Sequence, residues 1–277
     1  MLRAALIAVA ALWMTPAIAD EAVQFEAARY RLGELQQRLA RDRGETIQRP
    51  PAQIVTGYLT KPKGGGPFAA VVYLHGCLGL SNFRRASAAA QFTTWGYVTL
   101  VVDSFASRGI KDDCLGGLDD RQGDALGALR YLATLPYVDS RRVALVGLSK
   151  GGTAALSIAT ARRVELFEMP PGLRYKAAIA FYPSCSSGGN ELAIATLVLI
   201  GELDDWSRAA ECAWWAKRRR DGEVPVKVEV YPEAYHSFDN PTLQIATRAY
   251  GHWMKYDAAA TAKATAAMRD FLAVQLR

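Results

Sequence analysis

Residues 147–151 of the chain are Gly-Leu-Ser-Lys-Gly, and their types and spacing suit acyl transfer. They follow an apolar run and open a stretch rich in small residues that suit a helix. Where a strand turns sharply into a helix, the backbones two positions before and after the central residue come so close that only glycine fits. Such a turn presents its central residue at the carboxyl end of a sheet. The pattern therefore predicts Ser149 as a nucleophile.

A serine hydroxyl is a poor nucleophile unless a base takes its proton, so the chain must also supply a base and an acid. After a turn of this kind an acid and then a histidine follow the serine in the sequence. Only His236 and His252 lie beyond Ser149. His236 follows the last expected strand and is the predicted base, whereas a packing or surface role is favoured for His252. Asp204 is the predicted acid, and Asp205 is the alternative because it would also suit a helix N-cap.

The tetrahedral intermediate of acyl transfer needs two backbone N–H donors. Lys150, directly after the nucleophile, should supply one of them, and the loop after the expected strand 69–74 should supply the other from Cys77. Gly76 lets the backbone of that loop approach closely. His75 is expected to brace the loop through hydrogen bonds between its side chain and the backbone. The sequence thus predicts an oxyanion hole formed by Cys77 and Lys150.

Two aromatic residues near the predicted acid and base are candidates for contacts with substrate. Trp206 follows the aspartates, and Tyr235 precedes His236. Both are placed to line an apolar pocket, although packing in the core would explain either of them equally well.

The four cysteines should form two disulfides. Cys77 and Cys114 follow neighbouring expected strands. Cys185 follows the expected strand 177–182, and Cys212 lies in the expected helix after strand 197–200, so each pair should meet at one end of the sheet. The alternative is four buried free thiols that pack as small apolar residues. No C-x-x-C spacing occurs and the chain has only 3 histidines, which argues against a structural metal site. The predicted pairing is Cys77–Cys114 and Cys185–Cys212.

Strands and helices alternate from residue 54 onward, which is typical of a mainly parallel, doubly wound α/β sheet with helices on both faces. The alternating apolar residues of 224–230 suit a half-buried strand near an edge. Only residues 183–195 separate the expected strand 177–182 from the next one, where related proteins often insert a lid, so no cap domain is expected. The expected strands are 54–59, 69–74, 97–102, 143–146, 177–182, 197–200 and 224–230, and the expected helices are 84–95, 119–135, 150–160, 205–220 and 257–276.

The amino-terminal part of the chain divides into two segments. Residues 1–19 have one arginine, a short apolar run and an Ala-x-Ala site, the pattern of a secretory signal peptide whose run is too short to span a bilayer. Residues 20–50 are expected to form an amphipathic helix over Phe25–Arg43 and a linker, before an α/β domain at 51–277. The expected location is periplasmic or extracellular, without a membrane anchor after cleavage. The chain has a net charge of +6, but its basic residues form no stripe interleaved with aromatic residues, which argues against nucleic-acid binding.

Several of these motifs together resemble the dienelactone hydrolase family of α/β-hydrolases, from about residue 54 to the carboxyl terminus. The resemblance implies the α/β-hydrolase fold, a triad of Ser149, Asp204 and His236, and an oxyanion hole from Cys77 and Lys150. It implies no cofactor. The matching segments are His75-Gly76, Asp103-Ser104-Phe105 with Arg108-Gly109, 147–151, 201–204, 235–238 and 256–272.

The chain departs from the family's namesake enzymes in three ways. Those enzymes have a cysteine nucleophile where this chain has Ser149, and a glutamate that helps to activate it where this chain has Gly76. They hold a substrate carboxylate with arginines, one of them shortly after the histidine, where this chain has Asp239 and Asn240. Arg108 is a candidate for the other arginine, and a helix cap or a salt bridge would explain it equally well.

Together these features predict a serine hydrolase that cleaves a small-molecule carboxylic ester through an acyl-enzyme. One alternative is a peptidase or amidase of the prolyl-oligopeptidase type, which normally carries a large extra domain. The other is a non-catalytic exported binding protein with the same fold. The sequence leaves the substrate, the choice between Asp204 and Asp205, and the oligomeric state open.

Overall fold

Within the described residues of the computed structural model (20–49, 51–116, 120–187, 191–218 and 224–277), an eight-stranded sheet forms the centre of the molecule. Its strand order is β1-β2-β4-β3-β5-β6-β7-β8, parallel from β4 to β8, with β1 and β2 antiparallel at one edge. The strands are β1 (Glu21–Glu26), β2 (Ile54–Thr60), β3 (Phe68–Leu74), β4 (Val98–Asp103), β5 (Val138–Leu148), β6 (Ala177–Phe181), β7 (Ala195–Gly201) and β8 (Val226–Tyr231).

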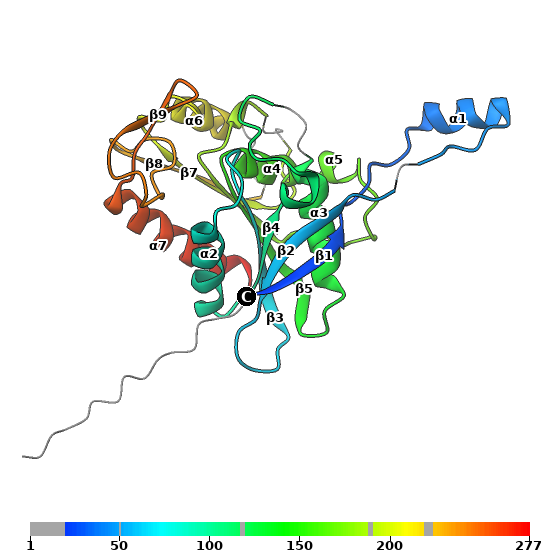
Figure 1. Cartoon of the computed structure of the whole chain (residues 1–277), viewed down its shortest axis with the longest axis horizontal. Coiled ribbons are helices and arrows are strands. Elements are labelled where there is room, and N and C mark those ends of the chain that lie inside the picture. The colour runs from blue at the N-terminus through cyan, green and yellow to red at the C-terminus, as the bar shows by residue number, and fades with distance from the viewer. Residues whose placement is uncertain (1–19, 50, 117–119, 188–190, 219–223) are drawn as a thin grey trace, which may run out of the picture.

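Helices cover both faces of this sheet, so its central strands are continuously apolar and buried. Helices α2 and α7 lie on one face, and α3, α4 and α6 lie on the other (Figure 1). The helices are α1 (Glu34–Arg43), α2 (Asn82–Thr94), α3 (Arg121–Ala133), α4 (Lys150–Ile158), α5 (Ala161–Val164), α6 (Ala209–Lys217) and α7 (Ala258–Gln275), with short 3-10 turns η1 (Ala106–Arg108) and η2 (Cys185–Ser187).

The sheet has a topological switch at β3. The chain runs from β3 to β4 on one side and later returns to β5 on the other side of β3. The loops that follow β3 and β5 therefore leave the sheet in opposite directions, and ligands of open α/β sheets bind in the crevice between such loops. This is where Cys77, after β3, and Ser149, after β5, lie.

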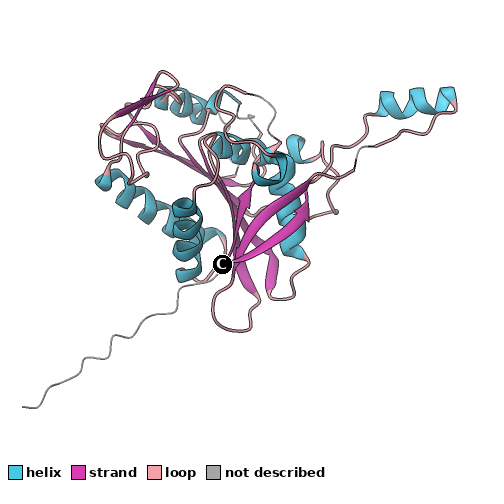
Figure 2. Ribbon diagram, in the orientation of Figure 1, coloured by secondary structure: helices cyan, strands magenta, loops and turns pink. Residues whose placement is uncertain are grey.

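The expected helix over Phe25–Arg43 is wrong in its first half. Residues Glu21–Glu26 form strand β1, which pairs antiparallel with β2 (Figure 2), and only Glu34–Arg43 are helical. Phe25 is buried against Tyr131 because alternation, not helical spacing, directs it towards the core. Helix α1 has no buried residue and projects away from the sheet (Figure 1).

Two further differences lie near the carboxyl ends of β7 and β8. Helix α6 begins at Ala209 rather than at residue 205, because residues 205–208 form the turn that follows Asp204. A short hairpin, β9 (Thr247–Ala249) and β10 (His252–Met254), was not expected from the sequence. Strand β8 lies at the sheet edge, as the alternation of its residues predicted.

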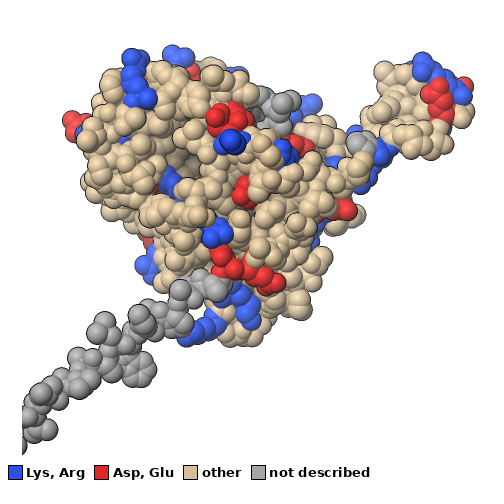
Figure 3. All heavy atoms as spheres, in the orientation of Figure 1, with Lys and Arg blue, Asp and Glu red and all other residues tan. Residues whose placement is uncertain are grey.

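The described part of the chain contains no helical cap between β6 and β7, in agreement with the expectation of an uncapped domain. It also contains no helix long and apolar enough to cross a membrane. The expected signal peptide, residues 1–19, lies outside the described residues. On the face shown in Figure 3, basic and acidic side chains are interspersed rather than gathered into one basic area.

Candidate active site

The turn between β5 and α4 has the geometry that its glycines predicted. Ser149 lies between the last residue of β5 and the first of α4, with φ 51° and ψ −115°. A Cβ atom on Gly147 would lie 2.1 Å from the carbonyl oxygen of Gly151, and one on Gly151 would lie 2.6 Å from that of His75. Both distances are impossible for real side chains, so these positions require glycine. The strained backbone of Ser149, of order 1–3 kcal/mol, is held by the packing around it.

Ser149, His236 and Asp204 form one hydrogen-bonded row. Asp204 Oδ2 lies 2.8 Å from His236 Nδ1, and His236 Nε2 lies 3.1 Å from Ser149 Oγ. An ionised carboxylate only accepts, so Nδ1 carries the imidazole proton and Nε2 is left to accept from the serine hydroxyl. The other carboxylate oxygen of Asp204 accepts the N–H groups of Trp206 (3.0 Å) and Ser207 (2.7 Å). Asp204 therefore caps its own turn and orients the imidazole at once.

The alternative acid and the alternative base form a separate pair further out. Asp205 Oδ1 accepts the N–H of Trp253 at 3.0 Å and lies 3.6 Å from His252 Nδ1. The imidazole of His252 stacks on Trp206, with 4.8 Å between ring centroids and an angle of 18°. The structure thus brings Asp204 rather than Asp205 to His236, and it keeps His252 away from Ser149.

The loop after β3 brings a second set of backbone donors close to the serine. A Cβ atom on Gly76 would lie 3.4 Å from the Cβ of Ser149, so the two backbones run close together. Within the described residues no acceptor binds the N–H of Cys77. The N–H of Lys150 belongs to the first turn of α4, where backbone donors have no partner within the helix. Both N–H groups are free to bind an oxyanion.

His75 braces this loop, as expected. Its Nδ1–H donates to the carbonyl oxygen of Gly76 at 2.7 Å, and its Nε2 accepts the N–H of Ser104 at 3.2 Å. Burial, assisted by the nearby positive charge of Arg121, lowers the pKa of His75 to about 4. The imidazole is therefore neutral at physiological pH and holds two loops together rather than moving protons.

A cavity of about 340 Å³ opens at Ser149 and His236. Trp206 lines it, as predicted from the sequence, but Tyr235 does not. Arg108 does not line it either, because Asp124 binds its guanidinium through two hydrogen bonds of 2.8 and 2.6 Å. The salt-bridge interpretation of Arg108 is the one that the structure supports. The apolar and aromatic part of the wall consists of Tyr73, Leu78, Phe83, Leu148, Tyr182, Trp206 and Met254.

One polar group of this wall was not anticipated. Arg84 forms an ion pair with Asp239, and the hydroxyl of Tyr182 donates to the same carboxylate at 2.7 Å. Burial, assisted by the charge of Asp239, raises the pKa of Tyr182 well above its usual value. The available sequence signal was Asp239 itself, which stands close to the position where the namesake enzymes have an arginine.

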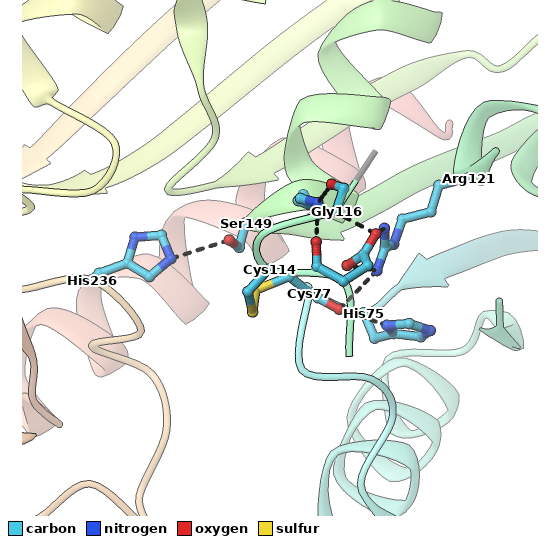
Figure 4. Close-up of a disulfide and its surroundings, with 10 residues drawn as sticks. His75, Cys77, Cys114, Gly116, Arg121, Ser149 and His236 are labelled. Atoms are coloured by element: carbon cyan, nitrogen blue, oxygen red, sulfur yellow. Dashed lines mark hydrogen bonds and ion pairs between the residues drawn. A yellow bond between two sulfur atoms is a disulfide. The ribbon is translucent and has the colours of Figure 1, made fainter. Parts of the chain in front are cut away.

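The cysteines are paired as the sequence analysis predicted. Cys77 is bonded to Cys114, with 4.8 Å between their Cα atoms, and Cys185 to Cys212, with 5.0 Å. The first disulfide lies beside Ser149, as Figure 4 shows. The second joins η2 to α6, and both of its cysteines are buried.

The model of the dienelactone hydrolase family matches residues 55–276. The chain belongs to the dienelactone hydrolase family. Membership in this family makes the chain a hydrolase. No curated protein matches it by sequence.

Solved structures of similar proteins share the α/β-hydrolase fold of this family member. A Klebsiella pneumoniae protein that bears the dienelactone hydrolase name has a TM-score of 0.62 and 16% identity, over 91% of this chain and 99% of its own. Esterase 2 of Thermogutta terrifontis with bound butyrate has a TM-score of 0.61 and 16% identity, over 79% and 89%. A dienelactone hydrolase-like promiscuous phosphotriesterase from metagenomic libraries has a TM-score of 0.59 and 19% identity, over 92% of this chain and 99% of its own. At these identities the likeness extends to the fold alone.

Proposed function

We propose that this member of the family is a serine esterase with Ser149 as nucleophile, His236 as general base and Asp204 as the acid that orients it. The observation that carries the proposal is the continuous row from Asp204 Oδ2 through His236 to Ser149 Oγ, with contacts of 2.8 and 3.1 Å. Such a row, beside two free N–H donors, is the arrangement that activates a serine hydroxyl.

The reaction proceeds in two halves. The Oγ of Ser149 bonds to the ester carbonyl carbon while its proton passes to Nε2 of His236, and the carbonyl oxygen becomes an oxyanion bound by the N–H groups of Cys77 and Lys150. The bond to the alcohol oxygen then breaks, and His236 gives its proton to that oxygen. Water attacks the acyl-enzyme by the same route, which releases the acid and restores Ser149. Asp204 stabilises the imidazolium in both halves.

The cavity favours an uncharged acyl ester. Arg84 is the charged side chain that lines it within the described residues, and Asp239 neutralises this arginine through an ion pair. The rest of the wall is mainly aromatic and aliphatic. Among the described residues of the wall a substrate carboxylate would find no unpaired arginine such as the namesake enzymes offer, so a neutral ester should be preferred over a carboxylate-bearing lactone.

The structural relatives support an ester substrate and a reactive nucleophile. Esterase 2 of Thermogutta terrifontis is seen with butyrate, and in another structure it is phosphonylated by cyclosarin. Here the equivalent chemistry would form an adduct at Ser149.

Turnover of p-nitrophenyl butyrate by residues 20–277 tests the proposal. Ser149→Ala should lower kcat by about four to six orders of magnitude, because triad members act as one unit. Ser184→Ala, a serine outside the cavity, should retain full activity. Activity that survives Ser149→Ala would contradict the assignment. Comparable turnover of a p-nitroanilide would favour the amidase, and no turnover at all would favour the binding protein.

The proposal includes export of the chain. Two disulfides are common in exported proteins and rare in reducing compartments. Amino-terminal sequencing of protein expressed from the full gene should show that it begins at Asp20. A chain that retains Met1 would contradict cleavage of residues 1–19.

A further inference from the structure

Both residues proposed as oxyanion donors use their side chains to hold one and the same loop. We call residues 113–116 the clamp loop. Cys77 is joined to it by the disulfide to Cys114. Lys150 Nζ donates to the carbonyl oxygens of Asp113 and of Gly116, the latter at 2.6 Å, and lies 3.4 Å from the carboxylate of Asp113. Figure 4 shows the disulfide, Ser149, Gly116 and the side chain of Arg121 gathered in one region.

The clamp loop is also bonded to the backbone that carries Cys77. The N–H of Asp113 donates to the carbonyl oxygen of Cys77 at 3.0 Å. Arg121 donates to the Asp113 carboxylate at 3.0 Å and, through its other terminal nitrogen, to the carbonyl oxygen of Gly76 at 3.0 Å. Arg121 and Asp113 are almost fully buried, with side chains 1% and 5% exposed, so this ion pair is shielded from water.

These contacts close a ring around the oxyanion site. Starting at the Cys77 backbone, the ring passes through the disulfide to the clamp loop, then through the ammonium group to Lys150 and the backbone of the nucleophile turn. Oxyanion donors act only when they lie about 2.7–3.1 Å from the developing charge. The loop after β3 is not part of the sheet, so this ring adds to the hydrogen bonds from His75, Arg121 and Asp113 that position the Cys77 N–H.

The ammonium group of Lys150 has no other evident task. Lys150 does not line the cavity at Ser149, so its Nζ is not placed to contact substrate. Its side chain is 31% exposed and is nevertheless turned inwards onto two carbonyl oxygens and a carboxylate. Fixing a long, flexible side chain in this way costs conformational entropy, which the three polar contacts offset.

We infer that the Lys150 side chain and the clamp loop form a positioning device that fixes the spacing between the two oxyanion donors, Cys77 N–H and Lys150 N–H. Lys150 then acts twice, on the oxyanion through its backbone and on the other donor through its side chain. The inference rests on the proposed function of Ser149. It predicts that loosening the ring weakens stabilisation of the transition state and leaves binding of the ester nearly unchanged.

Lys150→Met is the direct test, because it removes the ammonium group but keeps an unbranched side chain as far as Cε and the backbone N–H. With p-nitrophenyl butyrate, kcat should fall about 10- to 100-fold, as expected for a misplaced donor, while KM changes less than about threefold. A boronic acid that forms a tetrahedral adduct with the serine should bind more weakly by a similar factor. Lys150→Arg, which keeps the charge, should recover part of kcat, and Lys217→Met, on exposed α6, should behave as the parent protein.

The two disulfides provide a matched control for stability. Cys77→Ala/Cys114→Ala opens the ring, whereas Cys185→Ala/Cys212→Ala removes a bond of similar sequence separation (27 against 37 residues) elsewhere. Both double variants should lose similar thermal stability, but only the first should lose kcat. An equal loss of kcat in both would overturn the inference.

The outcomes separate this inference from the function on which it rests. If the parent protein neither hydrolyses esters nor is labelled at Ser149, the proposed function fails. If the parent protein is active through Ser149 and Lys150→Met retains full kcat, or raises KM alone, the positioning role fails and the esterase assignment stands.

Discussion

Two neighbouring aspartates pair with two different histidines at the carboxyl end of the sheet. In the inner pair, Asp204 and His236 lie 2.8 Å apart and their side chains are 0% and 2% exposed. In the outer pair, Asp205 and His252 lie 3.6 Å apart with side chains 43% and 33% exposed. Trp206 contacts both imidazoles: it stacks on His252, and its ring is tilted by 35° against that of His236.

The difference is what would make the inner Asp–His contact catalytic under the proposed function. Water screens the outer pair, so the electrostatic interaction between its side chains is weak, and neither residue touches the serine. The inner carboxylate is fixed by two backbone N–H groups and has one remaining task, which is to orient His236. The two aspartates are neighbours in the sequence. They have different surroundings because their burial and hydrogen bonding differ.

Among substitutions in the two pairs, the largest effect is expected from Asp204→Asn. An amide in place of the carboxylate no longer stabilises the imidazolium and favours the wrong tautomer of His236, so kcat should fall about 10⁴-fold. Steady-state kinetics with p-nitrophenyl butyrate measure this. If Asp205→Asn caused the larger loss, the assignment of inner and outer pairs would be reversed.

A third histidine extends the comparison, because His75 is buried without a directly bound carboxylate. Its pKa in the folded protein, about 4, lies below the value of about 6.5 in an unfolded chain, so the unfolded state binds more protons between these values. Stability from this group is present above pH 6.5 and is lost as the pH falls towards 4, by up to about 3 kcal/mol. Urea unfolding at pH 7.5 and pH 4.5 should show a smaller loss for His75→Asn than for the parent protein. Equal losses would refute the role of His75.

Trp206→Ala removes the side chain that both pairs share. The variant loses a wall of the cavity and the ring contact with His236, so kcat/KM should fall about tenfold, which corresponds to about 1.4 kcal/mol. Trp214→Ala is the control, since that tryptophan is 61% exposed on α6 and outside the cavity. Similar losses in both variants would mean that the effect is not local to the site.

The smallest effect is expected from the outer pair. Asp205→Asn and His252→Ala should each change kcat/KM by less than about threefold, because exposed ion pairs contribute about 0–1 kcal/mol. The loss of a triad member and the loss of an outer residue should therefore differ by at least three orders of magnitude in the same assay. A loss above a hundredfold for His252→Ala would place the base in the outer pair.

The sequence predicted those parts of the molecule that follow from local pattern. The nucleophile turn depends on glycines whose spacing is a steric requirement, and the buried strands are continuous apolar runs. The cysteine pairing followed from the rule that loops after neighbouring parallel strands meet at one end of a sheet. These features need only short segments and a general topology.

The features that were missed depend on contacts between distant segments. Strand β1 is six residues long with a glutamate at each end, and its Phe25 fits a helical stripe as well as a strand. Arg84 and Asp239 are 155 residues apart, and nothing near either residue indicates the other. The choice between Asp204 and Asp205 depended on which carboxylate is turned inwards, and this is set by the N–H groups of Trp206 and Ser207 rather than by residue type.

Mapping the adduct of a fluorophosphonate probe tests the central claim most directly. The parent protein should gain one probe mass, and peptide mass spectrometry should place it on Ser149. His236→Ala should be labelled far more slowly, because the serine then has no base. His252→Ala should be labelled at the parent rate. An adduct on another residue, or the absence of an adduct on protein that is folded and has both disulfides, would contradict the account.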